Sequence, residues 1–247
     1  MRAIIAKIIE TWEIGLIDQC VEGNFFENKI ALLVVLLIAV SILGYLIGSV
    51  NFAVIISKKF GEDIRDSGSG NAGATNMSRA YGKKIGALTL ALDALKAAIA
   101  CIIGILIYGS IGAFVAGFFC ILGHAFPVYF KFKGGKGVAC MAAVAFVTSP
   151  LVFFIMLAIY MIILIGFKMV SLASVMSAMM YPLFLSMIHG VGIQIIIALL
   201  CAALIVFLHR KNLARIFNHE EPKIEIFKKK RKKKSNEADI TDEDSKE

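Results

Sequence analysis

The most constraining feature of this sequence is a series of apolar runs, each long enough to cross a bilayer. A membrane-spanning helix needs about 20 apolar residues. Here 59% of the 247 residues are hydrophobic, whereas soluble domains are about 45–50% apolar. The pattern predicts an all-α, polytopic membrane bundle. The expected spans are residues 30–57, 85–108, 111–130, 138–165, 171–188 and 191–208.

The basic residues lie between these runs and therefore indicate how the chain is oriented in the membrane. Six Lys and Arg residues fall in the loop 58–84, three in the loop 131–136, and many more follow residue 208. Cytoplasmic loops carry an excess of Lys and Arg. All three segments are therefore expected in the cytoplasm, with the net charge of +8 directed at lipid headgroups and not at nucleic acid.

The run 138–165 decides how many times the chain crosses. It holds Ser149-Pro150 near its middle. A single kinked helix would give six crossings and would place the basic tail opposite the loop 58–84. Because proline interrupts helices, we favour a hairpin of two short helices, which gives seven transmembrane helices, the N-terminus outside and the C-terminus in the cytoplasm.

The two ends of the chain differ from the apolar centre. Residues 1–28 place apolar side chains at helical spacing and are predicted to form an amphipathic extension on the membrane. Residues 29–220 are predicted to form the membrane-integral domain. Residues 221–247 hold a basic block and then an acidic one, which predicts a disordered cytoplasmic tail.

A glycine-rich stretch occupies residues 61–82, GEDIRDSGSGNAGATNMSRAYG. Its glycines match G-x-G-x-x-G, but a dinucleotide fold needs a preceding strand, and here an apolar helix precedes. Residues without a Cβ still let backbone N–H groups approach an anion. Arg79 can grip a phosphate with two hydrogen bonds. We therefore interpret the stretch as a phosphate-binding loop, with a plain flexible turn as the alternative. The other polar groups are Ser69, Asn71, Thr75 and Asn76.

Two further basic stretches follow. GHAFPVYFKFKGGKGVA, residues 123–139, resembles a Walker A loop only superficially, because Phe130 and Gly137 stand where Gly and Ser or Thr are needed. Lys136 lies among glycines at a helix start, which still suits phosphate binding. The alternative is that the three lysines of this stretch serve only to fix the membrane topology. His209 and Asn212 close the last run and share a helix face.

Asp93 and Lys96 lie inside an apolar run, three residues apart. Charges at membrane depth are costly unless paired, so we expect an ion pair, either structural or in support of a site. Asp63 and Arg65 could brace the glycine-rich loop. Cysteine and histidine spacings predict neither a disulfide framework nor a metal site.

These motifs together resemble the bacterial acyl-phosphate:glycerol-3-phosphate acyltransferase family. The resemblance covers residues 44–220, and it rests on the glycine-rich stretch, LDALKA, GHAFPVYFKFKGGKGVA and HRKNLARI. It implies a seven-helix membrane enzyme that transfers a fatty acyl group from acyl phosphate to the 1-hydroxyl of glycerol 3-phosphate. The products would be lysophosphatidic acid and phosphate, the first step of bacterial phospholipid synthesis. It implies no cofactor and no obligate protein partner.

The resemblance also implies residue roles. Ser69, Gly70, Asn71, Thr75 and Asn76 match the family's phosphate motif. Arg79, Lys136, His209 and Asn212 match positions that hold the two phosphorylated substrates, and these four with Ser69 are the expected catalytic residues. The chain departs from the family at Asn51, Ala97 and Cys140, where Pro, Gly and Thr are common.

The residues fit this chemistry without a protein base. No acid stands five positions after any histidine, so the His–Asp dyad of other acyltransferases is absent. An acyl phosphate is already activated, so positioning and charge stabilisation suffice, and a substrate phosphate oxygen could accept the hydroxyl proton. An anion or phosphometabolite transporter is the alternative function, and a scaffold that binds anionic headgroups is a third. Transporters carry repeats and midplane sites, and we find no convincing repeat.

Overall fold

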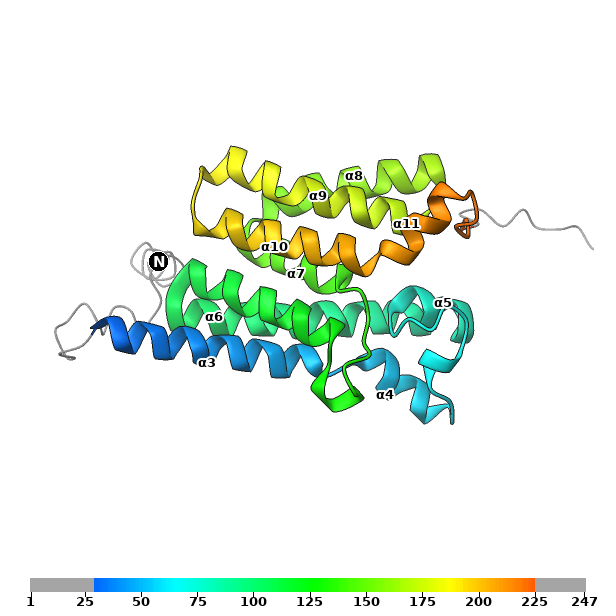
Figure 1. Cartoon of the computed structure of the whole chain (residues 1–247), viewed down its shortest axis with the longest axis horizontal. Helices are drawn as coiled ribbons and strands as arrows, with labels where there is room; N and C mark the ends of the chain where they lie inside the picture. The colour runs from blue at the N-terminus through cyan, green and yellow to red at the C-terminus, as the bar shows by residue number, and fades with distance from the viewer. Residues whose placement is uncertain (1–28, 225–247) are drawn as a thin grey trace, which may run out of the picture.

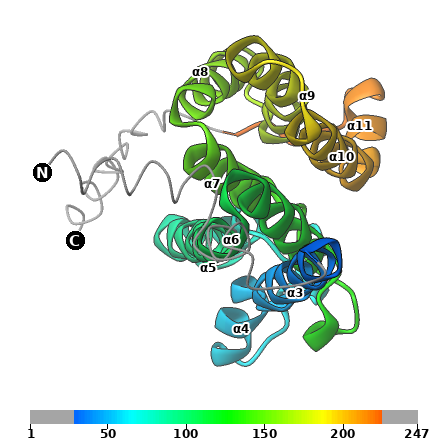
Figure 2. The ribbon, with the colours of Figure 1, turned by 90° about the vertical axis from the view of Figure 1, so that its left-hand side faces the viewer.

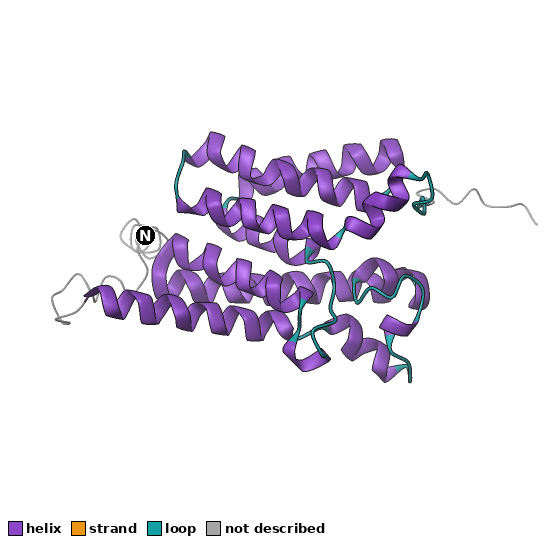
Figure 3. Cartoon of the chain, viewed as in Figure 1, coloured by secondary structure: helices purple, strands orange, loops and turns teal. Residues whose placement is uncertain are grey.

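The computed structural model describes residues 29–224, which are helices joined by short loops (Figure 3). The predicted N-terminal extension lies outside this range, as does most of the predicted tail. The α-helices are α3 Lys29–Ser49, α4 Phe52–Lys59, α5 Ala74–Tyr81, α6 Lys83–Ala125, α7 Val138–Thr148, α8 Pro150–Phe167, α9 Val170–His189, α10 Ile193–Leu208 and α11 Arg210–Phe217.

The long helices run side by side in a bundle (Figure 1). Seen end-on, α8, α9 and α10 form one group, α3, α4, α5 and α6 form another, and α7 lies between them (Figure 2). The short helices α4, α5 and α11 all lie at the same end of the bundle (Figure 1). That end therefore collects the segments predicted to hold phosphate.

The first apolar run, predicted as one span over 30–57, is broken in two. The α-helix α3 ends at Ser49 and α4 begins at Phe52. Asn51 causes the break, because its side chain accepts a hydrogen bond from the backbone N–H of Val54 (3.1 Å) and so caps α4. Asn51 thus provides a defined start for α4.

The helix α6 reverses direction within its own length. Tyr108 and Gly109 leave the helical conformation, and Gly109 has φ +52°. The backbones of Gly104 and Gly112 lie in contact on either side of this turn, which a straight helix would hold about 12 Å apart. The two predicted spans 85–108 and 111–130 therefore exist as antiparallel halves of α6, although the second ends at Ala125.

The run 138–165 also turns back on itself. Ser149 is extended (φ −157°) and Pro150 is the first residue of α8, a position that proline tolerates. Val138 and Tyr160 line the same cavity, whereas one continuous helix would separate them by about 33 Å. The hairpin is therefore correct and the single kinked helix is wrong.

The protein is an all-helical, multi-pass membrane protein. In the described part of the chain, four helices are long and apolar enough to span a membrane, or five if the bent pair α10–α11 counts as one. Large apolar side chains cover the outside of the bundle, as at Ile162, which is 71% exposed, and at Val35, which is 59% exposed. Lipid tails are the solvent that such a surface requires.

Close packing of α3 on the second half of α6 fixes the bundle end. A Cβ at Gly44 or Gly48 would collide with the backbone of Ala116 or Cys120. Small residues let membrane helices approach this closely. The end of α3 is thereby held beside the loop that follows α6, and the hydroxyl of Tyr45 donates a hydrogen bond to the carbonyl of Phe126 (2.8 Å).

Candidate active site

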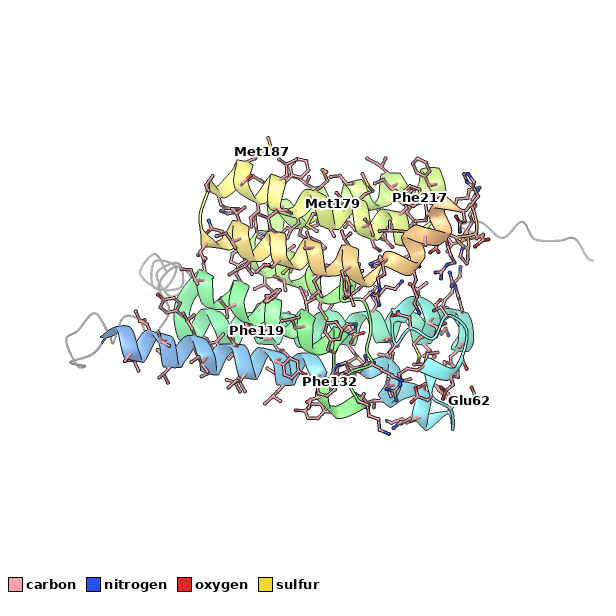
Figure 4. The ribbon with its side chains drawn as sticks, in the orientation of Figure 1. Glu62, Phe119, Phe132, Met179, Met187 and Phe217 are labelled. Carbon is pink, nitrogen blue, oxygen red and sulfur yellow. The ribbon has the colours of Figure 1, made fainter. Side chains whose placement is uncertain are left out.

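A cleft of about 500 Å³ opens at the end of the bundle where α5 and α11 lie. All nine residues predicted to bind substrate line it, although they come from three separate parts of the chain. Its cations greatly outnumber its carboxylates, and charged side chains gather at this end (Figure 4). The predicted residues are Ser69, Gly70, Asn71, Thr75, Asn76, Arg79, Lys136, His209 and Asn212.

The glycine-rich loop is held from within by Asn76. Its Nδ2 donates to the carbonyls of Ile64 (3.1 Å) and Ser67 (2.9 Å), and its Oδ1 accepts from the N–H of Ser69 (3.1 Å). Gly68 has φ +60°, and a Cβ there would collide with this amide. Asn76 is 1% exposed. Its polar atoms are thus engaged in shaping the loop, a role that differs from the predicted direct contact with substrate.

The second half of the predicted loop is a helix. Residues 74–81 form α5, which carries Thr75 and Arg79 one turn apart on the cleft side. The stretch 61–82 is therefore not a flexible turn. Helical placement fixes the Arg79 backbone relative to the glycines, which suits a guanidinium that must meet an anion held by the loop.

The Lys136 loop is fastened to the bundle through its backbone. The N–H groups of Gly134 and Gly135 donate to the carbonyls of Ala125 and His124, each at 3.1 Å. On the solvent side, Arg65 pairs with Asp63 (2.6 Å) and donates to the carbonyl of Phe130 (2.8 Å). The predicted brace by Asp63 and Arg65 is thus present, and it also reaches across to the second loop.

Lys136 ends in a network of buried polar groups. Its Nζ donates to Oδ1 of Asn212, whose Nδ2 donates to Oγ of Ser171 (2.7 Å) and to Oε1 of Glu221 (2.7 Å). Burial lowers the pKa of Lys136 to about 8, with Arg215 and Arg79 acting in the same direction and Glu221 opposing them. The ammonium is therefore partly desolvated and free to exchange its neutral partner for an anion.

Glu221 and Ser171 were missed by the sequence analysis. Glu221 was assigned to the disordered tail, yet it is 7% exposed, and Arg215 Nε donates to its Oε2 at 2.8 Å. Burial raises the pKa of Glu221, but hydrogen bonds from Ser171, Asn212 and Arg215 outweigh it and lower the pKa. The first four residues of the predicted tail, 221–224, thus belong to the folded part. The acid pair Glu220-Glu221, five and six residues after Arg215, was the available signal.

His209 lies at the bend of 58° between α10 and α11 and is 3% exposed. Its Nδ1 is 2.8 Å from the carbonyl oxygen of Ile205. A carbonyl only accepts, so Nδ1 carries the hydrogen, which leaves Nε2 as an acceptor in the neutral ring. His209 can therefore accept a hydrogen bond from a hydroxyl bound in the cleft.

A second cavity of about 600 Å³ adjoins the cleft. It is lined almost entirely by apolar side chains of α6, α7, α8 and α9. Five residues line both spaces, so the cleft and the cavity are neighbours. The shared residues are Leu90, Val138, Ala139, Tyr160 and Ser174. Such a site can take a molecule with an anionic head and an apolar tail.

Fold and site together define a membrane-integral protein that handles phosphorylated substrates, one of them amphiphilic, at one end of its bundle. The sequence model of glycerol-3-phosphate acyltransferases matches residues 38–219. The chain therefore belongs to the glycerol-3-phosphate acyltransferase family and is an integral-membrane enzyme of that class.

Individual relatives agree. The glycerol-3-phosphate acyltransferase of Bacillus subtilis (strain 168) is 40% identical over 184 residues, which cover 74% of this chain and 95% of the relative. That of Thermoanaerobacter pseudethanolicus is 42% identical over 186 residues, with 74% and 93% covered.

Two solved structures of PlsY (YgiH), an integral membrane glycerol 3-phosphate acyltransferase, share this fold. The glycerol 3-phosphate form has a TM-score of 0.73 at 38% identity and covers 76% of this chain and 96% of that one. The lysophosphatidic acid form has a TM-score of 0.71 at 37% identity, with 76% and 95% covered.

Proposed function

We propose that this enzyme transfers a fatty acyl group from acyl phosphate to the 1-hydroxyl of glycerol 3-phosphate, releasing lysophosphatidic acid and phosphate. The observation that carries the proposal is that a cation-lined cleft lies next to an apolar cavity and shares five lining residues with it. One donor molecule would fill both, with its phosphate in the cleft and its chain in the cavity. The reaction requires no cofactor, nucleic acid or protein partner.

The two phosphates are assigned to the cationic groups of the cleft. Arg79 and Lys136 reach it from α5 and from the loop before α7, and the backbone N–H groups around Ser69 and Gly70 add donors without a net charge. His209 and Asn212, on the opposite wall, would orient the glycerol hydroxyls. Ser69, Asn71 and Thr75 would complete the hydrogen bonds.

The chemistry needs one bond formed and one broken. The 1-hydroxyl oxygen attacks the acyl carbon, the bond from that carbon to the phosphate oxygen breaks, and phosphate leaves with the bonding electrons. A phosphate oxygen of the substrate takes the hydroxyl proton, so no protein base is required. Arg79 and Lys136 stabilise the charge that develops in the transition state.

We further infer that the chain crosses the membrane seven times, with the cleft in the cytoplasm. The passes are α3, the two antiparallel halves of α6, α7, α8, α9 and α10. Seven passes place the basic segments before α6, before α7 and after α10 on one side, as the distribution of Lys and Arg requires. The weakest pass is α7, which has only 11 residues.

A reconstituted assay tests the proposal. Purified protein in micelles receives labelled glycerol 3-phosphate with acyl phosphate, acyl-CoA or acyl carrier protein as the donor. Lysophosphatidic acid should form with acyl phosphate alone. Formation only from a thioester donor would refute the assigned donor. Absence of product together with phosphate transport into vesicles would favour the transporter instead.

A further inference from the structure

A cluster of buried ionisable side chains, Asp93, Lys96 and His124, has no role in the proposed reaction, although Asp93 and His124 line the cleft. They are 1%, 4% and 4% exposed. Lys96 Nζ lies 2.8 Å from Asp93 Oδ1 and 3.0 Å from His124 Nδ1, and the latter is 3.5 Å from Asp93 Oδ1. The predicted Asp93–Lys96 pair therefore exists, but His124 makes it a three-membered cluster.

The cluster is paired but is not closed on itself. Buried ions are costly unless paired, and Lys96 Nζ meets this need through its 2.8 Å contact with Asp93 Oδ1. The shortest hydrogen bond of the Lys96 ammonium, 2.6 Å, goes to the carbonyl of Val50. This bond leaves the cluster and joins the segment between α3 and α4.

Val50 is connected to the glycine-rich loop through the residue that follows it. The next residue, Asn51, caps α4 and directs its Nδ2 at the carbonyl of Ala72 (3.4 Å). Ala72 lies within the loop between Ser69 and α5. The Lys96–Val50 bond therefore anchors, through Asn51, the loop that carries the backbone N–H groups of the cleft.

His124 is connected to the Lys136 loop through backbone hydrogen bonds. Its carbonyl accepts the N–H of Gly135, and the neighbouring Ala125 carbonyl accepts the N–H of Gly134. A Cβ at Gly135 would collide with both the His124 ring and the Ala72 carbonyl, so the two loops and the cluster meet at this point. Lys136 follows one residue later.

We propose that Lys96, held by Asp93 and His124, is a positioning residue that sets the spacing between the glycine-rich loop and the Lys136 loop. Lys96 contacts Val50 and His124, each of which is linked to one of the loops, while Arg65 links the loops from the solvent side. The inference rests on the proposed function, because the spacing matters only if the two loops hold two reacting substrates.

The test compares three variants. Asp93→Asn with Lys96→Met removes both charges together and leaves no unpaired ion buried. Lys96→Met alone leaves the Asp93 carboxylate unpaired and should lower the Tm in detergent. Lys84→Met is the matched control, since Lys84 is an exposed lysine of the same helix. For each we would measure Tm, kcat and KM for both substrates.

The double variant should keep a Tm close to that of the wild type and lose about 100-fold in kcat, the order expected for a 1 Å misplacement of reacting groups. The KM values should change far less than kcat. The hydrogen bonds that hold the groups of each loop, such as Ser69 N–H to Asn76 Oδ1 and Lys136 to Asn212 of α11, do not involve Lys96, so each loop still binds its phosphate. Lys84→Met should match the wild type throughout.

Three outcomes would overturn the inference. An unchanged kcat in the folded double variant would mean that the cluster does not position the loops for catalysis. A Tm loss in the double variant as large as in Lys96→Met would mean that the cluster holds the bundle and not the loops. A higher KM with an unchanged kcat would indicate that the cluster supports substrate binding and does not position the two loops for the reaction. Failure of the proposed function itself would appear separately, as an inactive wild type.

Discussion

At the scale of single residues, the cleft depends on two cations, Lys136 and Arg79, which folding has placed in fixed positions. Lys136 has exchanged water for Asn212 and a buried network that ends at Glu221. Arg79 is held on a helix instead of a loop. Both changes place donors in advance where anionic oxygens would sit, so little reorganisation is needed when substrate binds.

Removing either cation should cost activity without cost to the fold. We expect Arg79→Ala and Lys136→Ala each to lower kcat by about 100- to 1000-fold, as for the loss of one preorganised donor to a developing charge. Turnover in membranes, normalised to protein amount, is the measurement. Lys59→Ala, an exposed lysine of α4, is the control. Near-normal turnover of Arg79→Ala and Lys136→Ala would remove them from the site.

The activity should also depend on pH through Lys136. Because burial lowers its pKa to about 8, the free enzyme holds the ammonium below pH 8 and loses it as pH rises through 8. kcat/KM, which reports groups of the free enzyme, should therefore fall above pH 8. In Lys136→Arg the guanidinium stays charged, so this decline should vanish from the residual activity. An identical profile in both proteins would exclude Lys136 as its source.

At the scale of elements, the hairpin of α7 and α8 forms the wall of the apolar cavity. From Val138 at the cleft to Phe146 is eight residues, or about 12 Å of helix, and α8 returns from Phe153 to Tyr160 along the same space. The rings of Phe146 and Phe153 meet edge to face at 5.2 Å at the far end. The short helix α7 and the longer α8 thus line one side of the cavity.

This aromatic pair should influence which acyl chains are preferred. Phe153→Ala lengthens the cavity, so we expect the ratio of kcat/KM between long and short acyl phosphates to rise by about tenfold, the low end of what a methylene-sized difference in an apolar pocket contributes. Phe154→Ala is the matched control, since Phe154 touches the same rings but does not line the cavity. A chain-length profile that is the same in all three proteins would contradict the assignment.

At the scale of the whole molecule, the bundle separates its chemistry from its membrane anchoring. The cleft occupies one end, where α5, the Lys136 loop and α11 meet, and the opposite end holds the turn between α9 and α10. A site at one end gives a water-soluble substrate direct access, while the lipid-like substrate enters from the bundle side. This arrangement differs from the midplane site of many transporters.

Labelling of intact cells can test the orientation. Val191 lies in the α9–α10 turn and is 94% exposed, whereas Lys84 is exposed at the cleft end. In a Cys20→Ser background, Val191→Cys should react with a membrane-impermeant maleimide in intact cells, and Lys84→Cys only after permeabilisation. The four cysteines described in the structure are buried and should stay unlabelled. The reversed pattern would place the cleft outside.

Predictions from the sequence succeeded where the signal was local. The turn at Pro150, the break near residues 108–110 and the pairing of Asp93 with Lys96 all followed from neighbouring residues. The break at Asn51 was missed because apolar residues continue across it, and a cap depends on a single side-chain bond. The hydrogen bonds of Asn76 within the glycine-rich loop were also missed, because they join residues 7 to 12 positions apart.

That this protein is a helical membrane bundle, and which loops are expected to hold phosphate, could be inferred from residue order alone, because lipid requires long apolar runs and anions favour glycines and cations. That these loops form one cleft, that Glu221 and Ser171 line it, and that an apolar cavity adjoins it became visible only in the folded protein. These features depend on contacts between segments up to about 150 residues apart, and a spacing along the chain contains no information on such contacts.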